Sequence, residues 1–346
     1  MRIAFDGRPI RIESIAILIL NHDGKSHLDT CLSSVLEQVN ENDHVYLVDN
    51  GSTDGSVGHV AKYYPRVRII EFETNLGFAL AYNRAVAVLS EEVILFLNND
   101  VEVDRGWLGQ LKVAVHGSPS RAILGSKILL YNNRGVINHA GGSLTLIGGG
   151  IDLDFMNRER RRTEETRFVG CVSGASMMIP RRVFLDLGGF DSDFFAYFED
   201  VDLCWRAWLA GYRVLFQPSS RVYHKLSSTM GPRLTPERVF LGEKNRLQTV
   251  LKNLELPNAV AGLFSLAVFN TIRLTHFLSS RKPKTALAIL RGDWWVFAHL
   301  PTIISKRSHI QQRRKIGDRF LLKYGLMIGL ADGVREFIRL AASSNE

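Results

Sequence analysis

Short apolar runs alternate with helical patterns in the N-terminal half of the chain, and this alternation limits the fold more than any other feature. Residues 15–20 are all apolar, as expected of a parallel strand that is buried on both faces. Runs at residues 45–48, 67–72 and 93–97 predict three more strands. Between the first two strands, apolar residues repeat at helical spacing: Leu28, Cys31, Leu32, Val35 and Leu36. The pattern predicts an α/β fold with a doubly wound, mainly parallel sheet.

Polar loops follow the expected strands at their C-terminal ends. Asp23, Asp49, Asp54 and Asp100 all lie in such loops. Because ligands of doubly wound sheets bind outside the carboxyl ends of the strands, we expect these acids along one edge of the sheet. Several carboxylates at a ligand-binding edge favour a divalent cation, a sugar or both as the ligand.

Several common motifs are missing from the sequence. No G-x-G-x-x-G follows the first strand, and neither G-x-x-x-x-G-K-[ST] nor G-x-S-x-G occurs. Their absence argues against a nicotinamide dehydrogenase, a P-loop phosphotransferase and an α/β-hydrolase. Cys31, Cys171 and Cys204 are far apart, which indicates neither a disulfide framework nor a zinc site and fits a reduced compartment.

An acidic stretch follows a run of aromatic residues near the middle of the chain. Glu199, Asp200 and Asp202 open a predicted helix whose apolar stripe is Val201, Trp205, Trp208 and Leu209. A single acid at a helix start usually reflects the helix dipole, whereas adjacent acids beside aromatics favour a general base with a raised pKa. Asp202 is spaced to pair with Arg206. Small residues after Asp200 are expected to leave space along its face: Cys204, Ala207 and Gly211.

The C-terminal third differs from the rest of the chain. After a predicted helix at 239–254, apolar stretches at residues 259–269, 286–290 and 294–304 are interrupted by polar residues. Basic residues flank these stretches: Arg281, Lys282, Lys284, Lys306, Arg307, Arg313, Arg314 and Lys315. We therefore expect two domains, residues 1–232 and a helical region at 233–346 whose helices lie on an anionic membrane surface. The alternative is a helical bundle that packs against the sheet or forms a homodimer.

The net charge of +8 alone is compatible with nucleic acid, anionic lipid or a phosphorylated ligand. The basic residues are not interleaved with aromatics in the manner of a nucleic-acid-binding module, so we expect no nucleic acid partner. No stretch reaches the roughly 20 uncharged apolar residues of a spanning helix. The first residues lack signal-peptide character, and we therefore expect a cytoplasmic protein on the inner face of the plasma membrane.

From residue 15 to residue 229 the chain resembles the inverting family-two glycosyltransferases with the GT-A fold, and within them the bacterial rhamnosyltransferase-like branch. The resemblance rests on motifs that occur in the order of the family: residues 17–24, 48–54, 75–79, 97–100, 173–175 and 188–203. Each motif is weak alone, but together they extend over most of the first two thirds of the chain.

The resemblance implies a role for each matching residue. Asp49 would hold the nucleotide base, and the nucleotide sugar would lie among Asn21, His22, Asp23, Asn50, Asn75, Gly77, Phe78, Asn98, Asn99 and Gly174. Asp100 and His224 would bind a divalent cation, Mg²⁺ or Mn²⁺, that bridges the diphosphate. Asp200 would be the catalytic base, with Glu199 beside it.

Two positions depart from the pattern of the family. Asn98 replaces the first acid of the usual Asp-x-Asp, and His22 stands where a tyrosine is common. The first change bears on the affinity and identity of the cation, and the second on the contact that this position makes with the nucleotide.

The implied function is transfer of a sugar from a nucleotide-sugar donor to an oligosaccharide or lipid-linked acceptor in cell-envelope polysaccharide synthesis. The branch implies dTDP-rhamnose as the donor. One alternative is an inactive sugar-nucleotide-binding scaffold of an envelope assembly. Another is a relative of the processive polysaccharide synthases, although neither spanning helices nor a Q-x-x-R-W motif is found. A nucleotidyltransferase would need a glycine-rich first loop, which is missing after Leu20.

Overall fold

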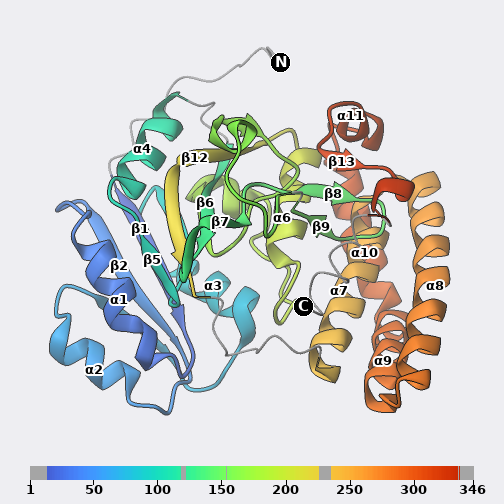
Figure 1. Ribbon diagram of the computed structural model, residues 1–346, viewed down its shortest axis with the longest axis horizontal. Helices are drawn as coiled ribbons and strands as arrows, with labels where there is room; N and C mark the ends of the chain where they lie inside the picture. Colours follow the sequence, from blue (N-terminus) through green and yellow to red (C-terminus); the bar gives the residue numbers. More distant parts are fainter. Residues whose placement is uncertain (1–13, 118–121, 153, 226–234, 334, 336–346) are drawn as a thin grey trace.

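A large mixed sheet forms the centre of the molecule, and a group of C-terminal helices lies at one side of it (Figure 1). This computed structural model describes residues 14–117, 122–152, 154–225, 235–333 and 335. The predictions for residues 1–13 and for the domain boundary at 232 fall outside the described residues. The strand order is β10-β12-β6-β11-β4-β1-β2-β3, with β5 beside β12 and β7 beside β6. This architecture confirms the predicted α/β fold.

The N-terminal half of the sheet is parallel, as predicted. Its strands are β1 (Ile15–Asn21), β2 (Asp43–Asn50), β3 (Arg68–Phe72) and β4 (Val93–Asn98). The helices α1 (Lys25–Leu36), α2 (Ser56–Tyr63) and α3 (Gly77–Ala87) connect them, and α4 (Trp107–Gly117) follows. β1 lies between β2 and β4, so the ends of three strands meet at one edge of the sheet.

The other half of the sheet is mixed. Its strands are β5 (Val101–Val103), β6 (Ala122–Leu130), β7 (Asn133–His139), β10 (Arg167–Phe168), β11 (Ser176–Pro180) and β12 (Arg213–His224). The sequence predicts a strand that ends at residue 216, but β12 continues to His224. A register shift between Gln217 and Arg221 accommodates Pro218, which has no N–H to donate to the ladder. The extension brings His224 opposite Val101 of β5.

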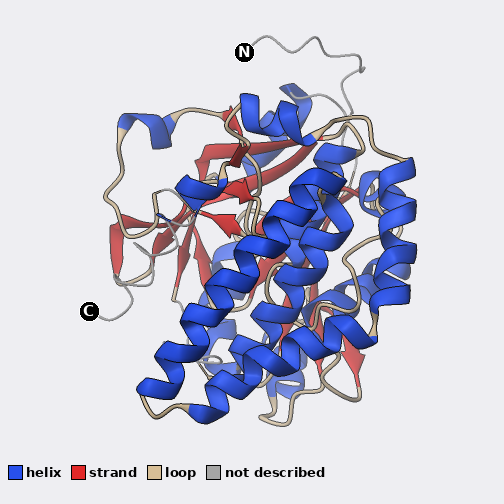
Figure 2. Cartoon of the chain, turned by 90° about the vertical axis from the view of Figure 1, so that its right-hand side faces the viewer, coloured by secondary structure: helices blue, strands red, loops and turns tan. Residues whose placement is uncertain are grey.

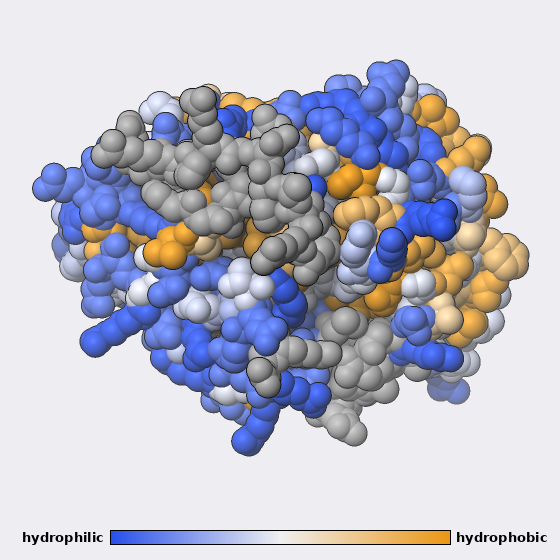
Figure 3. All heavy atoms as spheres, turned by 90° about the horizontal axis from the view of Figure 1, so that it is seen from above, coloured by the Kyte–Doolittle hydropathy of each residue, from blue (hydrophilic) through white to orange (hydrophobic). Residues whose placement is uncertain are grey.

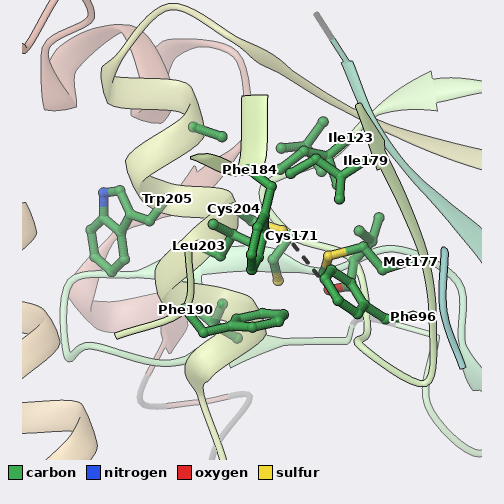
Figure 4. Packing of buried hydrophobic residues seen from close by; sticks show 14 of the residues in the cluster. Phe96, Ile123, Cys171, Met177, Ile179, Phe184, Phe190, Leu203, Cys204 and Trp205 are labelled. Carbon is green, nitrogen blue, oxygen red and sulfur yellow. Dashed lines mark hydrogen bonds between the residues drawn. The ribbon is translucent and has the colours of Figure 1, made fainter. Parts of the chain in front are cut away.

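Helix α6 (Glu199–Leu209) packs tightly on the sheet, together with α5 (Arg181–Asp186). Figure 4 shows Leu203 and Cys204 of α6 among Phe96, Met177 and Phe190. The expectation of open space beside Asp200 is wrong, because Cys204 and Ala207 are fully buried. Their small side chains instead let the helix approach the sheet, and the Cys204 thiol lies 3.9 Å from the Val172 carbonyl oxygen.

Short elements complete the catalytic half of the chain. A small sheet is made of β8 (Ser143–Thr145), β9 (Gly150–Ile151) and β13 (Met327–Ile328), and a single 3₁₀ turn, η1, spans Arg161–Glu164. Because β13 comes from the C-terminal region and pairs with β8, this sheet joins the two halves of the chain.

The named helices of the described C-terminal region are α7 (Pro236–Asn253), α8 (Leu256–Ser279), α9 (Pro283–Ala298), α10 (Leu300–Gln312) and α11 (Asp318–Lys323). Figure 2 shows the longer ones lying side by side across the face turned toward the viewer. The interruption expected after residue 269 is wrong: α8 is one continuous helix of 24 residues. Its Asn270 and Arg273 point inward and donate to Glu243 of α7, at 2.7 and 2.5 Å.

Helix α8 also corrects the expectation that no stretch could cross a membrane. By length and composition alone it is long and apolar enough to do so, and only 22% of its most apolar window is buried. The core helix of a soluble protein passes the same test, but such a helix is mostly buried, and α8 is not.

Candidate active site

The ends of β1, β2 and β4 are joined by a network of short polar side chains. The side-chain amide of Asn21 donates to the Asp49 carboxylate at 3.1 Å and to the Ser52 hydroxyl at 3.0 Å. The side-chain amide of Asn99 donates to the side-chain oxygen of Asn21 at 2.7 Å. Asp49 is 1% exposed and also accepts from the backbone N–H of Ser52 at 2.9 Å. A Cβ on Gly24 would lie 2.1 Å from the Asn99 amide, so only glycine permits this approach. The strand ends therefore form one preorganised edge.

Two predicted loop residues, His22 and Asp23, brace the same edge. Asp23 accepts from the backbone N–H groups of Thr53 and Asp54, at 2.6 and 3.2 Å. A ring nitrogen of His22 lies 3.0 Å from the carbonyl oxygen of Asn50. These bonds hold the loop after β1 against the loop after β2.

A tight turn after β3 holds the start of α3. Asn75 accepts from the side chain of Asn50 and from the N–H of Gly77, both at 2.9 Å. Gly77 has a φ of +76°, and a Cβ there would lie 2.5 Å from the Phe195 carbonyl oxygen. Phe78 donates its N–H to that same oxygen at 2.7 Å. The turn therefore packs directly against the segment that precedes Glu199.

Asp100 and His224 lie next to each other although they are far apart in the sequence. His224 Nε2 is 3.1 Å from Asp100 Oδ1, and His224 Nδ1 is 2.9 Å from Asn138 Oδ1. The second contact orients the ring so that Nε2 faces the carboxylate. An oxygen and a nitrogen ligand at this spacing fit one divalent cation. Among the described residues, no three His, Cys, Asp or Glu side chains are placed so that they could hold one metal ion together. A cation at Asp100 and His224 would therefore need further ligands, such as phosphate oxygens and water.

Asp200 is held in place by backbone donors. Its carboxylate accepts from the N–H of Gly174 at 2.9 Å and from the N–H of Val201 at 2.8 Å. Burial raises the pKa of Asp200, although these two N–H groups and the nearby His139 partly oppose the rise. Asp200 is therefore a carboxylate whose proton affinity is raised while its ionised form keeps two donors.

Glu199 has a different environment beside it. Burial and the neighbouring Asp200 raise the pKa of Glu199 well above its ordinary value. Its Oε2 atom is buried and has no hydrogen-bond partner among the described residues. When two adjacent acids share a buried site, the one with fewer donors keeps the proton. We therefore expect Glu199 to hold a proton more tightly than Asp200 does.

The segment around Gly174 connects the two acidic sites. Asn98, at the end of β4, donates its N–H to the Ala175 carbonyl oxygen at 3.2 Å, and the preceding Gly174 binds Asp200. A Cβ on Gly174 would lie 2.9 Å from the Phe78 ring. The fold therefore places Asp200 one short segment away from the strand that leads to Asp100.

Helix α7 supports the segment before Glu199 and Asp200, the predicted catalytic acids, and the sequence did not indicate this contact. The Asn245 amide donates to the carbonyl oxygens of Ala196 and Tyr197, at 2.9 and 2.8 Å. Tyr197 and Phe198, just before Glu199, have positive φ values of 72° and 66°. Such a conformation is costly for large side chains and persists only where neighbours hold it. The polar residues of this helix, Asn245 among them, gave no sign in the sequence of which residues they would contact.

A buried charge network continues from this helix. Lys252 bonds to Asp191 and lies 3.2 Å from Asp202, whose predicted pairing with Arg206 is confirmed at 2.7 Å. Burial alone would raise the pKa of Asp202, but Lys252 and Arg206 lower it overall. Lys306 of α10 bonds to Asp191 as well. The catalytic helix is thereby fixed to the C-terminal region by ionic contacts.

Several basic residues expected to face a membrane are used inside the protein instead. Arg307 donates to the carbonyl oxygens of Leu251 and Leu254, at 2.6 and 2.8 Å. Arg313 bonds to Asp186 at 2.6 Å, and Arg314 to Asp318 at 3.1 Å. These contacts are typical of a helical region packed on the rest of the protein, whereas Lys315 and the earlier cluster near residue 281 are exposed.

Comparisons with known proteins agree with this geometry. The sequence model described as glycosyl transferase family 2 matches residues 14–188. An N-acetylglucosaminyl-diphospho-decaprenol L-rhamnosyltransferase of Mycobacterium tuberculosis is 30% identical over 239 residues, which are 62% of this chain and 77% of that protein.

Two solved structures illustrate the fold. GalNAc-T7, crystallised with UDP, GalNAc and Mn²⁺, has a TM-score of 0.58 at 18% identity, covering 70% of this chain and 48% of its own. The mannosyltransferase PcManGT of Pyrobaculum calidifontis, in complex with GDP-Man and Mn²⁺, has a TM-score of 0.52 at 15% identity, covering 90% and 89%. The chain therefore belongs to glycosyl transferase family 2 and has the GT-A fold.

Proposed function

We propose that this glycosyltransferase moves a sugar from a nucleoside diphosphate sugar to a saccharide acceptor with inversion at the anomeric carbon. The observation that carries the proposal is the bridge at Gly174, which holds Asp200 next to the strand that leads to Asp100 and His224. A base and a cation site at neighbouring positions match the two needs of a single displacement. These needs are removal of a proton from the acceptor and neutralisation of the leaving diphosphate.

The donor would lie along the edge formed by β1, β2 and β4. The network of Asn21, Asp49 and Asn99 fixes the shape of this edge, and the turn at Asn75 and Gly77 closes one end of it. Asp100 and His224 would hold Mg²⁺ or Mn²⁺ there. The bound cation would act as a Lewis acid toward the diphosphate.

Asp200 is the proposed general base. As the acceptor oxygen bonds to the anomeric carbon, the bond from that carbon to the diphosphate breaks and the hydroxyl proton passes to Asp200. Glu199, which keeps its own proton, does not compete for it. Because burial raises the pKa of Asp200, we expect the transfer rate to fall as the pH drops through that raised value.

Rhamnose as the sugar and a lipid-linked saccharide as the acceptor are the finer part of the proposal. They are supported by the name of the mycobacterial relative, which describes transfer of L-rhamnose to N-acetylglucosaminyl-diphospho-decaprenol. This chemistry belongs to cell-envelope polysaccharide synthesis. A panel of nucleotide sugars that includes dTDP-rhamnose would test the donor, because a bound donor raises the melting temperature by mass action.

Calorimetry with a nucleoside diphosphate tests the site itself. We expect binding to strengthen when Mn²⁺ is added to the wild-type protein. In the presence of Mn²⁺, Asp100→Ala should bind the nucleoside diphosphate at least about 10-fold more weakly than wild type does. This factor is the lower end of the loss that changes around metal ligands cause. Glu102→Ala is the matched control, because it removes a nearby carboxylate that bonds to Arg134 instead. Equal affinity with and without metal in the wild type would contradict the proposed cation site.

A further inference from the structure

The outer face of α8 is mostly apolar, although Thr271, Thr275 and His276 are exposed near its C-terminal end. Its large exposed side chains are Leu256, Val260, Phe264, Val268, Ile272 and Leu278. Phe264 is 72% exposed and Ile272 is 61% exposed. On the exposed side of this fully described helix there is no Asp, Glu, Lys or Arg, because Arg273 turns inward to Glu243. A contiguous uncharged face of this length is unusual on a surface that meets only water.

The same apolar surface continues on to α9. Trp294 and Phe297 are 67% and 66% exposed, and their ring centroids are 5.5 Å apart. A groove of about 420 Å³ between the helices is lined by Leu263, Ala267, Thr271 and Phe297, among others. Figure 3 shows hydrophobic side chains gathering at the right-hand edge, on the side where Figure 1 places α8.

Positive charge is concentrated at the end of this surface. Arg281 and Lys282 lie in the turn between α8 and α9, Lys284 lies in the first turn of α9, and all three are exposed. The sequence has no Asp or Glu between Glu255 and Asp293. Asp293, which lines the groove, is the one acid at this surface among the described residues 256–298. A mostly apolar face that ends in several exposed cations complements an anionic lipid surface.

Helix α8 is tied to the rest of the protein on its inner side. Asn270 and Arg273 both bond to Glu243 of α7. A Cβ on Gly262 would lie 2.3 Å from the Leu146 carbonyl oxygen, so the helix backbone touches the catalytic domain there. A helix that crossed a bilayer would lose these contacts and leave Glu243 buried without them. The packing therefore favours a helix that lies flat on the membrane surface.

We propose that the outer face of α8, with Trp294 and Phe297 of α9, is the surface by which this protein docks on an anionic bilayer. The helix lies in the plane of the interface, and Arg281, Lys282 and Lys284 contact the headgroups. This inference is independent of the proposed transfer reaction. It assigns membrane contact to a cluster other than Lys306 to Lys315, whose described contacts are internal.

Cosedimentation with lipid vesicles tests the proposal on the full-length protein. Wild type should bind vesicles of phosphatidylcholine with added phosphatidylglycerol more tightly than phosphatidylcholine alone. Replacing Arg281, Lys282 and Lys284 by Gln should weaken binding to the anionic vesicles by about 10²-fold, since each cation near such a surface contributes about a fivefold factor. Replacing Phe264, Val268 and Ile272 by Gln should abolish binding to both vesicles.

A matched control removes the same number of exposed apolar side chains from the catalytic domain, by changing Tyr63, Val88 and Val113 to Gln. It should bind vesicles like wild type.

Vesicle binding by the α8 variant equal to that of the control would overturn the proposal. Loss of a solution dimer in the α8 variant, with no vesicle binding by wild type, would assign the face to a second copy instead. Failure of alkaline carbonate to release the bound protein would show a spanning helix. Transfer to a soluble acceptor should be unchanged in all three variants, which separates this test from that of the reaction.

Discussion

Helices α7 and α8 are neighbours with opposite relations between polarity and burial. α7 buries its polar side chains: Glu243, Lys244, Asn245, Arg246, Gln248, Thr249, Lys252 and Asn253. α8 exposes its large apolar ones, such as Phe264 and Ile272. Neither arrangement is expected of an ordinary amphipathic surface helix, whose apolar stripe faces the core.

The difference shows what each helix serves. Buried polar groups destabilise a protein unless they are bonded, and those of α7 find partners in the segment that carries the catalytic acids. Exposing apolar side chains to water is unfavourable, and Phe264 and Ile272 of α8 are nevertheless mostly exposed. The first helix thus packs against the predicted active site, and the second forms part of the external surface.

The largest expected effect concerns the buried lysine of α7. Lys252→Met removes a partner of Asp191 and of the fully buried Asp202. Leaving these carboxylates with fewer cations should lower the free energy of unfolding by about 3–5 kcal/mol, measured by denaturant titration. Lys62→Met, on an exposed helix, is the control and should change it by less than about 0.5 kcal/mol. Equal, small effects would mean that α7 is not bound through this network.

A kinetic effect is expected from Asn245→Ala. Without the amide, the strained Tyr197–Phe198 segment can relax and move Glu199 and Asp200. We expect kcat to fall by about 10- to 100-fold, because a small misplacement of a reacting group slows the reaction by this much. The affinity for the donor should stay unchanged. Asn245→Asp, which keeps the shape but not the donor, should behave alike. A parallel loss of donor affinity and melting temperature would indicate a purely structural role.

Asp191 should make the attachment of the C-terminal helices sensitive to acid. Burial alone would raise its pKa, but Lys252 and Lys306 lower it overall. A lowered folded-state pKa contributes stability above the unfolded-state value of about 4, and this stability is lost as the pH falls below it. We expect the loss to be about 2 kcal/mol larger in wild type than in Asp191→Asn between neutral and acidic pH. Identical pH profiles of unfolding would exclude this contribution.

The smallest effect is expected on the outer face of α8. Val268→Gln and Ile272→Gln should each change the free energy of unfolding by less than about 0.5 kcal/mol in lipid-free solution. Leu266→Ala, on the buried side of the same helix, should lower it by about 2–5 kcal/mol. A large loss from Val268→Gln would show that the outer face is covered in the free protein, contrary to the contrast drawn above.

The parallel half of the sheet could be predicted because its signals are local. The core strands β1 and β4 are apolar on both faces, and helical spacing separates successive strands, so their parallel direction follows from the sequence. The continuity of β12 and α8 could not be predicted in this way. Pro218 in β12 is tolerated by a register shift, and Arg273 in α8 by a partner on α7.

The residues of the candidate site also differ in how far the sequence could predict them. Asp100, Asp200 and His224 were named through resemblance to a family, and the structure brings Asp100 and His224 together, while their roles stay predictions. Asn245 and Lys252 were missed because their partners lie far away in the sequence, on a segment whose shape no local pattern describes.

The most direct test of the account compares Asp200→Asn with Glu199→Gln in single-turnover transfer, with donor affinity measured alongside. We predict that Asp200→Asn binds nucleotide and metal like wild type but transfers sugar at least about 10² times more slowly, because it cannot accept the proton. Glu199→Gln mimics the protonated acid and should stay within about 10-fold of wild type. Transfer by Asp200→Asn at close to the wild-type rate, with Glu199→Gln inactive, would contradict the assignment of the base.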